Sequence, residues 1–238
     1  MGNDFFRFKQ FIVRQGETAM KVGVDSVLLG AWTNPDKTTR ILDVGAGTGL
    51  LALMLAQRFS DAVIDAVEIE REAYHQALEN VDGSPWNRRI RVICDDFLNY
   101  TTYCSSHYDL IISNPPYFTA SLKSLDTKRN VARHNDSLPP RSLLDGSAKL
   151  LSTDGILAVV LPPAEASLLM NEVTSYGLFV KRILHVQSLP SKPVCRMLLE
   201  LSKTKCLPEE IYLCIEKLDR SDYTDEYKQL TKEFYLKF

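Results

Sequence analysis

The chain has 238 residues, 45% of them hydrophobic, with 28 lysines and arginines against 30 aspartates and glutamates. This length and composition predict one large domain, or a domain with a small appendage, and give no sign of disorder. No apolar run approaches the roughly 18 residues of a membrane span, and the first residues lack the layout of a signal peptide. Five cysteines form no C-x-x-C pair. We therefore expect a soluble cytoplasmic protein without disulfides or a metal site.

The net charge of −2 hides an uneven distribution of charge along the chain. Residues 60–80 are acidic, whereas residues 117–149 and 177–206 carry an excess of lysine and arginine. Binding of phosphate groups depends on local basic surface, so the overall balance does not exclude a nucleic-acid partner. Scattered, solvated lysines would explain clusters of this size about equally well.

The pattern of apolar residues divides the chain into two parts. Residues 1–39 form an N-terminal extension with an apolar, helix-like piece at 26–32, and residues 40–238 form the main domain. From residue 40, short apolar runs alternate with helical patterns, which is typical of βαβ units and a parallel sheet. The predicted strands are 40–44, 63–68, 90–94, 108–113 and 155–161, and the predicted helices are 50–58, 71–81 and 142–151.

The end of the chain carries three further predicted elements. Apolar runs at 179–186 and 194–201, with Pro190 and Pro193 between them, predict a hairpin. Residues 223–238 predict an amphipathic helix with an aromatic end. The sequence therefore predicts an α/β fold with a doubly wound, mostly parallel sheet of seven strands and an antiparallel hairpin at one edge.

A glycine-rich loop follows the first strand of the main domain. Gly45, Ala46 and Gly47 lie where the strand turns into a helix, and the glycines let the backbone turn tightly and approach a ligand. Dinucleotide sites use the spacing G-x-G-x-x-G, whereas this loop reads G-x-G-x-G and follows Asp43. A carboxylate there would repel a pyrophosphate and attract the ammonium group of S-adenosylmethionine.

Acidic residues also end the next two predicted strands. Glu68 can accept hydrogen bonds from both hydroxyls of a ribose, and Asp96 can accept one from an adenine amino group while Phe97 covers the ring. Each acid alone could equally be a solvated strand end. Together with the glycine loop, they resemble the class I S-adenosylmethionine-dependent methyltransferases over about residues 40–200. The resemblance implies a Rossmann-like fold, with Asp43, Gly45, Ala46, Gly47, Glu68, Asp96 and Phe97 at the cofactor.

The segment Asn114-Pro115-Pro116-Tyr117 follows the fourth predicted strand. Two prolines stiffen the turn and remove two N–H donors, so the Asn114 side chain and the Pro115 carbonyl can act as hydrogen-bond acceptors. Two acceptors that grip an exocyclic amine free its lone pair to attack a methyl sulfonium, and Tyr117 can stack on the target ring. The segment resembles N-P-P-Y amino-methyltransferases of adenine, guanine or glutamine nitrogens. This resemblance assigns catalysis to Asn114, Pro115 and Tyr117 and also places Asn114 at the cofactor.

Further segments resemble one family over nearly the whole chain: bacterial tRNA (adenine-N6)-methyltransferases that modify valine tRNA beside its anticodon. The most specific match is Ala19–Gly23 with Asp25 and Leu28–Trp32, and Arg129-x-x-Ala132-Arg133 also matches. The connection at 186–194 departs from the family by being shorter. The resemblance implies that residues 1–39 pack on the cofactor site, with Lys21 and Asp25 near its methionine end. The residues assigned to RNA are Tyr117, Lys128, Arg129 and Arg133.

Three other functions compete with this interpretation. The nearest is an amino-methyltransferase of ribosomal RNA bases or of a protein glutamine, although glutamine enzymes usually have more than 39 residues before the loop. A nicotinamide oxidoreductase is disfavoured by Asp43 and the glycine spacing. A catalytically silent RNA-binding module would have no need of the acceptor turn at Asn114.

Overall fold

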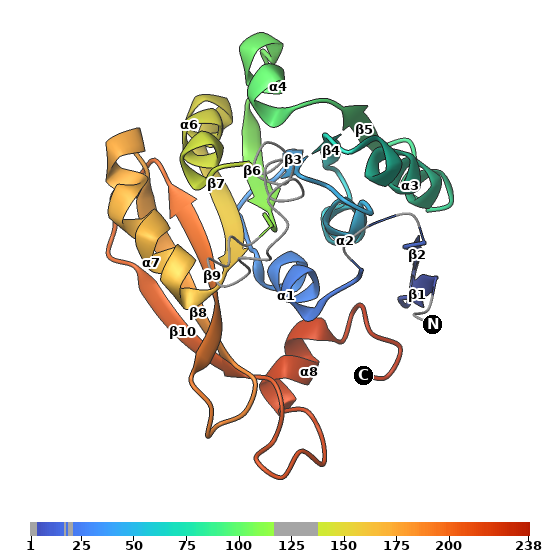
Figure 1. The fold of residues 1–238 in the computed structure, drawn as a ribbon, viewed down its shortest axis with the longest axis vertical. Helices are drawn as coiled ribbons and strands as arrows, with labels where there is room; N and C mark the ends of the chain where they lie inside the picture. The colour runs from blue at the N-terminus through green and yellow to red at the C-terminus, as the bar shows by residue number, and fades with distance from the viewer. Residues whose placement is uncertain (1–3, 17, 19–20, 117–137) are drawn as a thin grey trace, which may run out of the picture.

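A computed structural model of the chain describes residues 4–16, 18, 21–116 and 138–238. Within these residues an eight-stranded sheet has the order β10-β8-β9-β7-β6-β3-β4-β5 (Figure 1). Strand β9 is antiparallel to β7 and β8, and all other neighbouring strands are parallel. The strands are β3 (Arg40–Val44), β4 (Val63–Glu68), β5 (Ile90–Cys94), β6 (Tyr108–Ser113), β7 (Leu151–Leu161), β8 (Phe179–Gln187), β9 (Val194–Ser202) and β10 (Glu209–Cys214).

Helices cover both faces of the sheet. One face packs on α1 (Val24–Trp32), α2 (Leu50–Arg58), α3 (Arg71–Asp82) and α8 (Asp225–Thr231). The other face packs on α4 (Phe97–Tyr103), α6 (Pro140–Leu150), α7 (Pro163–Glu172) and the 3₁₀ turn η1 (Val173–Tyr176). Alternate residues of β7 enter opposite cores: Ile156 and Ala158 face the first group of helices, and Leu157 and Val159 face the second. A strand that is buried on both faces is apolar at every position, which explains the unbroken run of apolar residues.

The predicted doubly wound, mostly parallel sheet is confirmed, as are the positions of its predicted strands and helices. It has one strand more than the seven predicted, because β10 pairs in parallel with β8. The hairpin of β8 and β9 therefore lies inside the sheet, and β10 forms that edge. The sequence of β10, EEIYLC, is largely exposed or half-exposed, so it lacks a clear apolar pattern.

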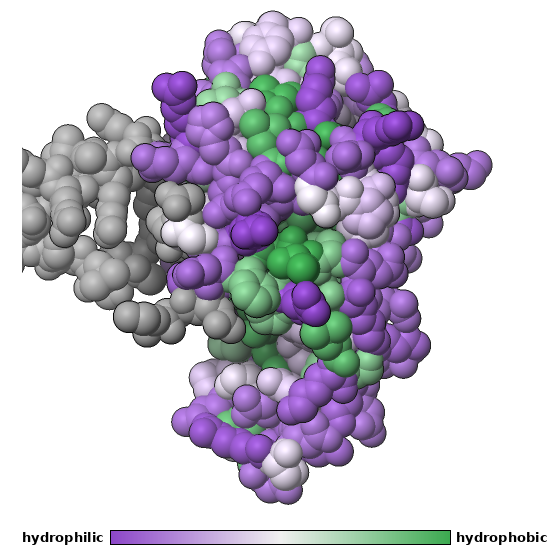
Figure 2. Space-filling model, turned by 90° about the vertical axis from the view of Figure 1, so that its right-hand side faces the viewer, coloured by the Kyte–Doolittle hydropathy of each residue, from purple (hydrophilic) through white to green (hydrophobic). Residues whose placement is uncertain are grey.

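The predicted C-terminal helix is shorter than expected, since α8 ends at Thr231. Beyond it, the buried Phe234 accepts a backbone hydrogen bond from Lys9 N. The ring of Phe8, between β1 (Phe5–Arg7) and β2 (Ile12–Arg14), stacks on Tyr235 with the ring centroids 6.1 Å apart. Contacts with the N-terminal segment thus replace further helical turns. The strands β1 and β2 and the C-terminal segment lie on one side of the molecule (Figure 1). Figure 2 shows that hydrophilic residues cover most of this side, around a hydrophobic group near its middle.

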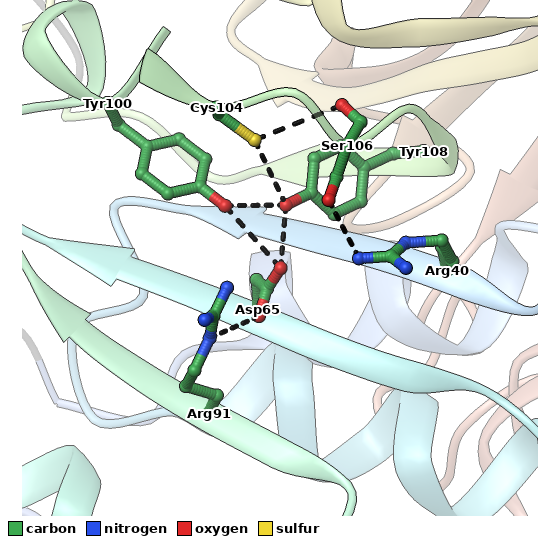
Figure 3. A network of polar contacts seen from close by, with 7 residues as sticks. All are labelled: Arg40, Asp65, Arg91, Tyr100, Cys104, Ser106 and Tyr108. Atoms are coloured by element: carbon green, nitrogen blue, oxygen red, sulfur yellow. Dashed lines mark hydrogen bonds and ion pairs between the residues drawn. The ribbon is translucent and has the colours of Figure 1, made fainter.

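A network of hydrogen bonds ties α4 to the sheet (Figure 3). The buried carboxylate of Asp65 in β4 accepts a hydrogen bond of 2.6 Å from the Tyr108 hydroxyl and one of 2.8 Å from Arg91 Nε. The Tyr108 hydroxyl lies 2.5 Å from that of Tyr100 in α4. Because burying a carboxylate and two hydroxyls is favourable only when they are paired, this network fixes α4 against β4 and β6.

We predict that Gly146→Ala destabilises the fold. A Cβ at position 146 in α6 would lie 2.5 Å from Phe97 Cε1, and the buried ring cannot move aside. The free energy of unfolding should fall by about 1–3 kcal/mol, as in other overpacked cores. Gly30→Ala in α1 is the matched control, because there the nearest atom belongs to the flexible Met54 side chain. Urea unfolding measures both variants, and an equal loss in the two would contradict the prediction.

Candidate functional site

The order of the strands reverses beside β3. The chain forms β3, β4 and β5 in one direction across the sheet and then crosses to the other side of β3 to form β6. In such sheets the loops that follow the two diverging strands leave a crevice at their carboxyl ends, where ligands bind. The loop after β3 contains Gly45, and the loop after β6 begins at Asn114. The Ser113 hydroxyl donates a hydrogen bond of 2.8 Å to the Val44 carbonyl and joins the two strand ends.

The glycine loop is held tightly against β4. The backbone N–H groups of Gly45 and Ala46 both donate to the Val67 carbonyl, at 2.9 and 3.1 Å. Gly45 and Gly47 have φ values of 71° and 56°, in the left-handed region that favours glycine. A Cβ built on either would meet no atom within 4 Å, so open space lies beside this backbone. The loop therefore offers a rigid backbone surface to a ligand.

Glu68 at the end of β4 is fixed by the same loop. Its Oε2 accepts a hydrogen bond of 2.7 Å from Gly47 N, and its Oε1 accepts one of 2.8 Å from Glu70 N. The side chain is largely buried. Each carboxylate oxygen has two lone pairs, so both oxygens keep a site for a hydroxyl donor. This geometry fits the predicted contact with a ribose.

Asp43 lies beneath the loop and has no exposed surface. Its Oδ2 accepts a hydrogen bond of 3.1 Å from Ala52 N in the first turn of α2, and so replaces the side-chain cap that Gly49 cannot provide. Its Oδ1 is buried without a hydrogen-bond partner among the described residues. Burial raises the pKa of Asp43 to about 7, against the lowering effect of the Ala52 bond, and the charge of Glu68 raises it further. A cation above the loop would favour the ionised form of Asp43. The carboxylates around the loop therefore fit a positively charged ligand.

Asp96 at the end of β5 caps helix α4. Its Oδ1 accepts hydrogen bonds from Leu98 N and Asn99 N, at 2.7 and 3.1 Å. Both bonds use the same oxygen, and no hydrogen bond to Oδ2 is seen among the described residues. Phe97, which the resemblance places over a bound ring, is buried, and its ring lies against Gly146 of α6. Phe97 is the first residue of α4 and packs in the core that α4 shares with α6.

The side chain of Asn114 is half-buried and contacts the N-terminal extension. Its Nδ2 donates a hydrogen bond of 2.8 Å to the hydroxyl of Ser26 in α1. Pro115 and Pro116 follow it and line a small apolar pocket together with Leu143 of α6 and residues of α7. The asparagine is therefore held at the switch point beside the glycine loop. Tyr117, Lys128, Arg129 and Arg133 lie outside the described residues.

The other two predicted cofactor residues lie on the N-terminal side of α1. Asp25 forms an ion pair with Arg196 of β9, with Asp25 Oδ2 2.8 Å from Arg196 Nε. Lys21 is exposed. The family resemblance implies that both lie near the methionine end of a cofactor. The ion pair of Asp25 anchors the start of α1 to the sheet.

Three residues near the site were missed by the sequence analysis. Ser26 contacts Asn114. Ile69 directly follows Glu68 and is 44% exposed, and Leu98 in the first turn of α4 is 40% exposed. Ile69 and Leu98 are large apolar residues beside the ends of two adjacent strands. Because such residues are normally buried, their exposure indicates a surface that a ligand can cover.

Across the described ranges, no helix is long and apolar enough to cross a membrane. In the same residues, no three His, Cys, Asp or Glu side chains come together as a potential metal site. The five cysteines are not bonded to one another.

Comparison with known proteins gives consistent matches. The family model described as "Methyltransferase small domain" matches residues 20–174. A protein of Bacteroides fragilis named tRNA1(Val) (adenine(37)-N6)-methyltransferase is 48% identical, and one of the same name from Parabacteroides distasonis is 46% identical; both matches cover 100% of both chains. Among solved structures, a predicted O-methyltransferase from Agrobacterium tumefaciens is 19% identical with a TM-score of 0.62, over 88% of this chain and 96% of that one. This last match concerns the fold.

We predict that Asp43→Asn changes how stability depends on pH. The ordinary pKa of an aspartate is about 3.9, so as pH rises the unfolded chain loses this proton before the folded protein does. The raised pKa therefore lowers the free energy of unfolding between about pH 4 and about pH 7, by at most about 4 kcal/mol, and has no further effect above that range. In the Asn variant, the free energy of unfolding should not show this decrease between about pH 4 and about pH 7.

Urea unfolding over a series of pH values measures this difference. Asp154→Asn, at an exposed position of β7, is the matched control and should follow the wild-type curve. Parallel curves for Asp43→Asn and the wild type would show that the buried carboxyl does not titrate in this range.

Proposed function

The chain belongs to the Methyltransferase small domain family, and from this premise we propose that it transfers a methyl group from S-adenosylmethionine to N6 of an adenosine beside the anticodon of valine tRNA. Relatives that carry this function in their names match the whole chain, one of them at 48% identity. The observation that carries the proposal is structural: Asn114 is held at the switch point, one strand away from the glycine loop after β3 and two strands away from Glu68 at the end of β4. A cofactor on the loop and an amine at Asn114 would be neighbours.

The cofactor would lie across the ends of β3, β4 and β5. Gly45, Ala46 and Gly47 would support it with backbone, and Glu68 would accept hydrogen bonds from the ribose hydroxyls. Asp96 Oδ2 would accept one from the adenine amino group. Exposed Ile69 and Leu98 would pack on the adenine ring in the role first expected of Phe97. The ligand supplies an electrophilic methyl group on a sulfonium, and Asp43 favours its positive charge through the electric field from beneath the loop.

The N-terminal extension, residues 1–39, would close the site on its other side. Ser26 reaches Asn114, and Asp25 is anchored to Arg196 nearby. Lys21 precedes this turn and is exposed, as a contact to a cofactor carboxylate or to RNA requires. In this arrangement α1 forms a wall of the crevice.

This chain's own residues would activate the amine without a histidine base. The lone pair of an exocyclic adenine nitrogen is delocalised into the ring, which makes the nitrogen a poor nucleophile. Hydrogen bonds from its two hydrogens to Asn114 Oδ1 and to the Pro115 carbonyl would favour a tetrahedral nitrogen whose lone pair points at the methyl group. Tyr117 would stack on the ring. After transfer, the nitrogen is positively charged and loses its proton to water.

The tRNA substrate and a cytoplasmic location follow from the same proposal. An anticodon loop offers unpaired bases, so turning one out costs little. Lys128, Arg129 and Arg133 would contact its phosphates, and a helical turn would put the two arginines on one face.

We predict that Asn114→Ala abolishes methyl transfer while cofactor affinity changes by less than about threefold. Loss of a hydrogen-bond group aimed at the transition state costs about 100-fold or more in kcat. Transfer of labelled methyl groups to an unmodified valine tRNA transcript measures the rate, and calorimetry measures cofactor binding. Asn171→Ala, an exposed asparagine of α7, is the control and should keep wild-type activity. Substantial activity in Asn114→Ala would refute the catalytic role of this side chain.

Replacing both Arg129 and Arg133 with Glu should weaken tRNA binding and flatten its dependence on salt. Each phosphate contact contributes about 0.7–0.9 to the slope of log K against log salt, so losing two lowers the slope by about 1.5. Titrations of labelled tRNA at several salt concentrations test this. An unchanged slope would mean that these arginines lie away from the RNA.

A further inference from the structure

A side-chain hydrogen bond joins helix α1 to the residue that follows β6. Asn114 Nδ2 donates to Ser26 Oγ at 2.8 Å, and the two residues are 88 positions apart in the chain. Ser26 lies in the first turn of α1, and both side chains are partly buried. The contact therefore joins the N-terminal extension to the loop that carries the proposed chemistry.

The helix that carries Ser26 is firmly placed. The next three residues, Val27, Leu28 and Leu29, have no exposed surface and belong to the core shared with α2. The preceding residue, Asp25, pairs with Arg196 at 2.8 Å. Core packing on one side of Ser26 and an ion pair on the other hold its hydroxyl in a fixed position relative to the sheet.

The bond engages the amide end of the Asn114 side chain. A carboxamide has an acceptor oxygen at one end and a donor NH₂ group at the other. Rotation about the Cβ–Cγ bond is broad when nothing holds the group. To activate the target amine, Asn114 Oδ1 must face the hydrogens of that amine. If the side-chain NH₂ group faced them instead, it could not accept their hydrogen bonds. The hydrogen bond to Ser26 restricts rotation of the carboxamide about the Cβ–Cγ bond, and it uses Nδ2 and not Oδ1.

We propose that Ser26 is a positioning residue for methyl transfer, which holds the Asn114 carboxamide so that Oδ1 meets the target amine. This inference rests on the proposed function and adds to it a residue from outside the main domain. Ser26 acts through Asn114 and does not itself touch the reacting atoms. Its loss should therefore lower kcat and leave the KM for tRNA and the affinity for the cofactor unchanged.

Two substitutions separate positioning from a merely structural role. Ser26→Ala removes the hydroxyl, and Ser26→Thr keeps it. Alanine favours a helix more than serine does, and threonine favours it slightly less. If Ser26 only supports α1, stability and activity should both follow the order Ala, Ser, Thr. If Ser26 positions Asn114, the Thr variant should be more active than the Ala variant, because it keeps the hydroxyl. Stability should still follow helix propensity, with the Ala variant the more stable of the two.

The experiment measures kcat, KM for an unmodified valine tRNA transcript, cofactor affinity and Tm for the full-length protein. We expect kcat to fall about tenfold in Ser26→Ala, the equivalent of one neutral hydrogen bond, and to return to within about threefold of wild type in Ser26→Thr. Ser167→Ala is the matched control, because this serine bonds a backbone carbonyl on the exposed side of α7. A wild-type kcat in Ser26→Ala overturns the proposal. So does an equal loss in both variants, since the hydroxyl would then not be the group that matters.

Asn114→Ala, measured in parallel, separates this inference from the proposed function. If that variant is inactive and Ser26→Ala is fully active, the reaction mechanism stands and only the positioning role fails. If Asn114→Ala itself remains active, the catalytic assignment fails, and any loss in Ser26→Ala would have a different origin.

Discussion

The site depends on the reversal of strand order next to β3. Because β4 and β6 lie on opposite sides of β3, the loops after β3 and β6 diverge. Sheets with this order bind ligands at the carboxyl ends of the strands beside the reversal. The hydrogen bond from the Ser113 hydroxyl to the Val44 carbonyl joins the ends of β6 and β3 where the two loops begin. The glycine loop, Glu68 and Asn114 all take their positions from these strand ends. A different order of the same strands would separate them.

Four buried carboxylates show how this fold compensates for the removal of charges from water. Asp65 and Glu68 have hydrogen-bond donors on both oxygens. Glu200, which has no exposed surface, pairs with Arg182 and with the backbone of Asn34. Asp43 differs, because one of its oxygens has no partner in the described structure and its pKa is raised to about 7. The uncompensated acid lies directly under the glycine loop, where a cationic ligand would relieve part of the cost of its burial.

The N-terminal extension is part of the same folded unit. Phe8, Phe11 and Val13 enter the core beside α2, and Asn80 of α3 bonds both Arg14 and the carbonyl of Thr48 in the glycine loop. At the end of β6, α1 contacts Asn114 through Ser26. Both loops of the proposed site are thus supported from behind by residues that precede the main domain. A rigid support of this kind is what a reaction based on placement requires.

The sequence by itself determined the sheet and which candidate site residues stand at the ends of its strands. Strands buried on both faces are apolar throughout, and the glycine loop and the acids mark where those strands end, so the places of Asp43, Glu68 and Asn114 could be predicted. Only the tertiary structure decided the rest. The direction of Phe97 depends on the close approach of α4 to Gly146, and β10 pairs in an exposed position that leaves no apolar pattern. Asp25 meets Arg196 across 171 positions, and Ser26 meets Asn114 across 88. The local pattern of apolar residues does not predict such contacts, because they form only when elements distant in the sequence pack together.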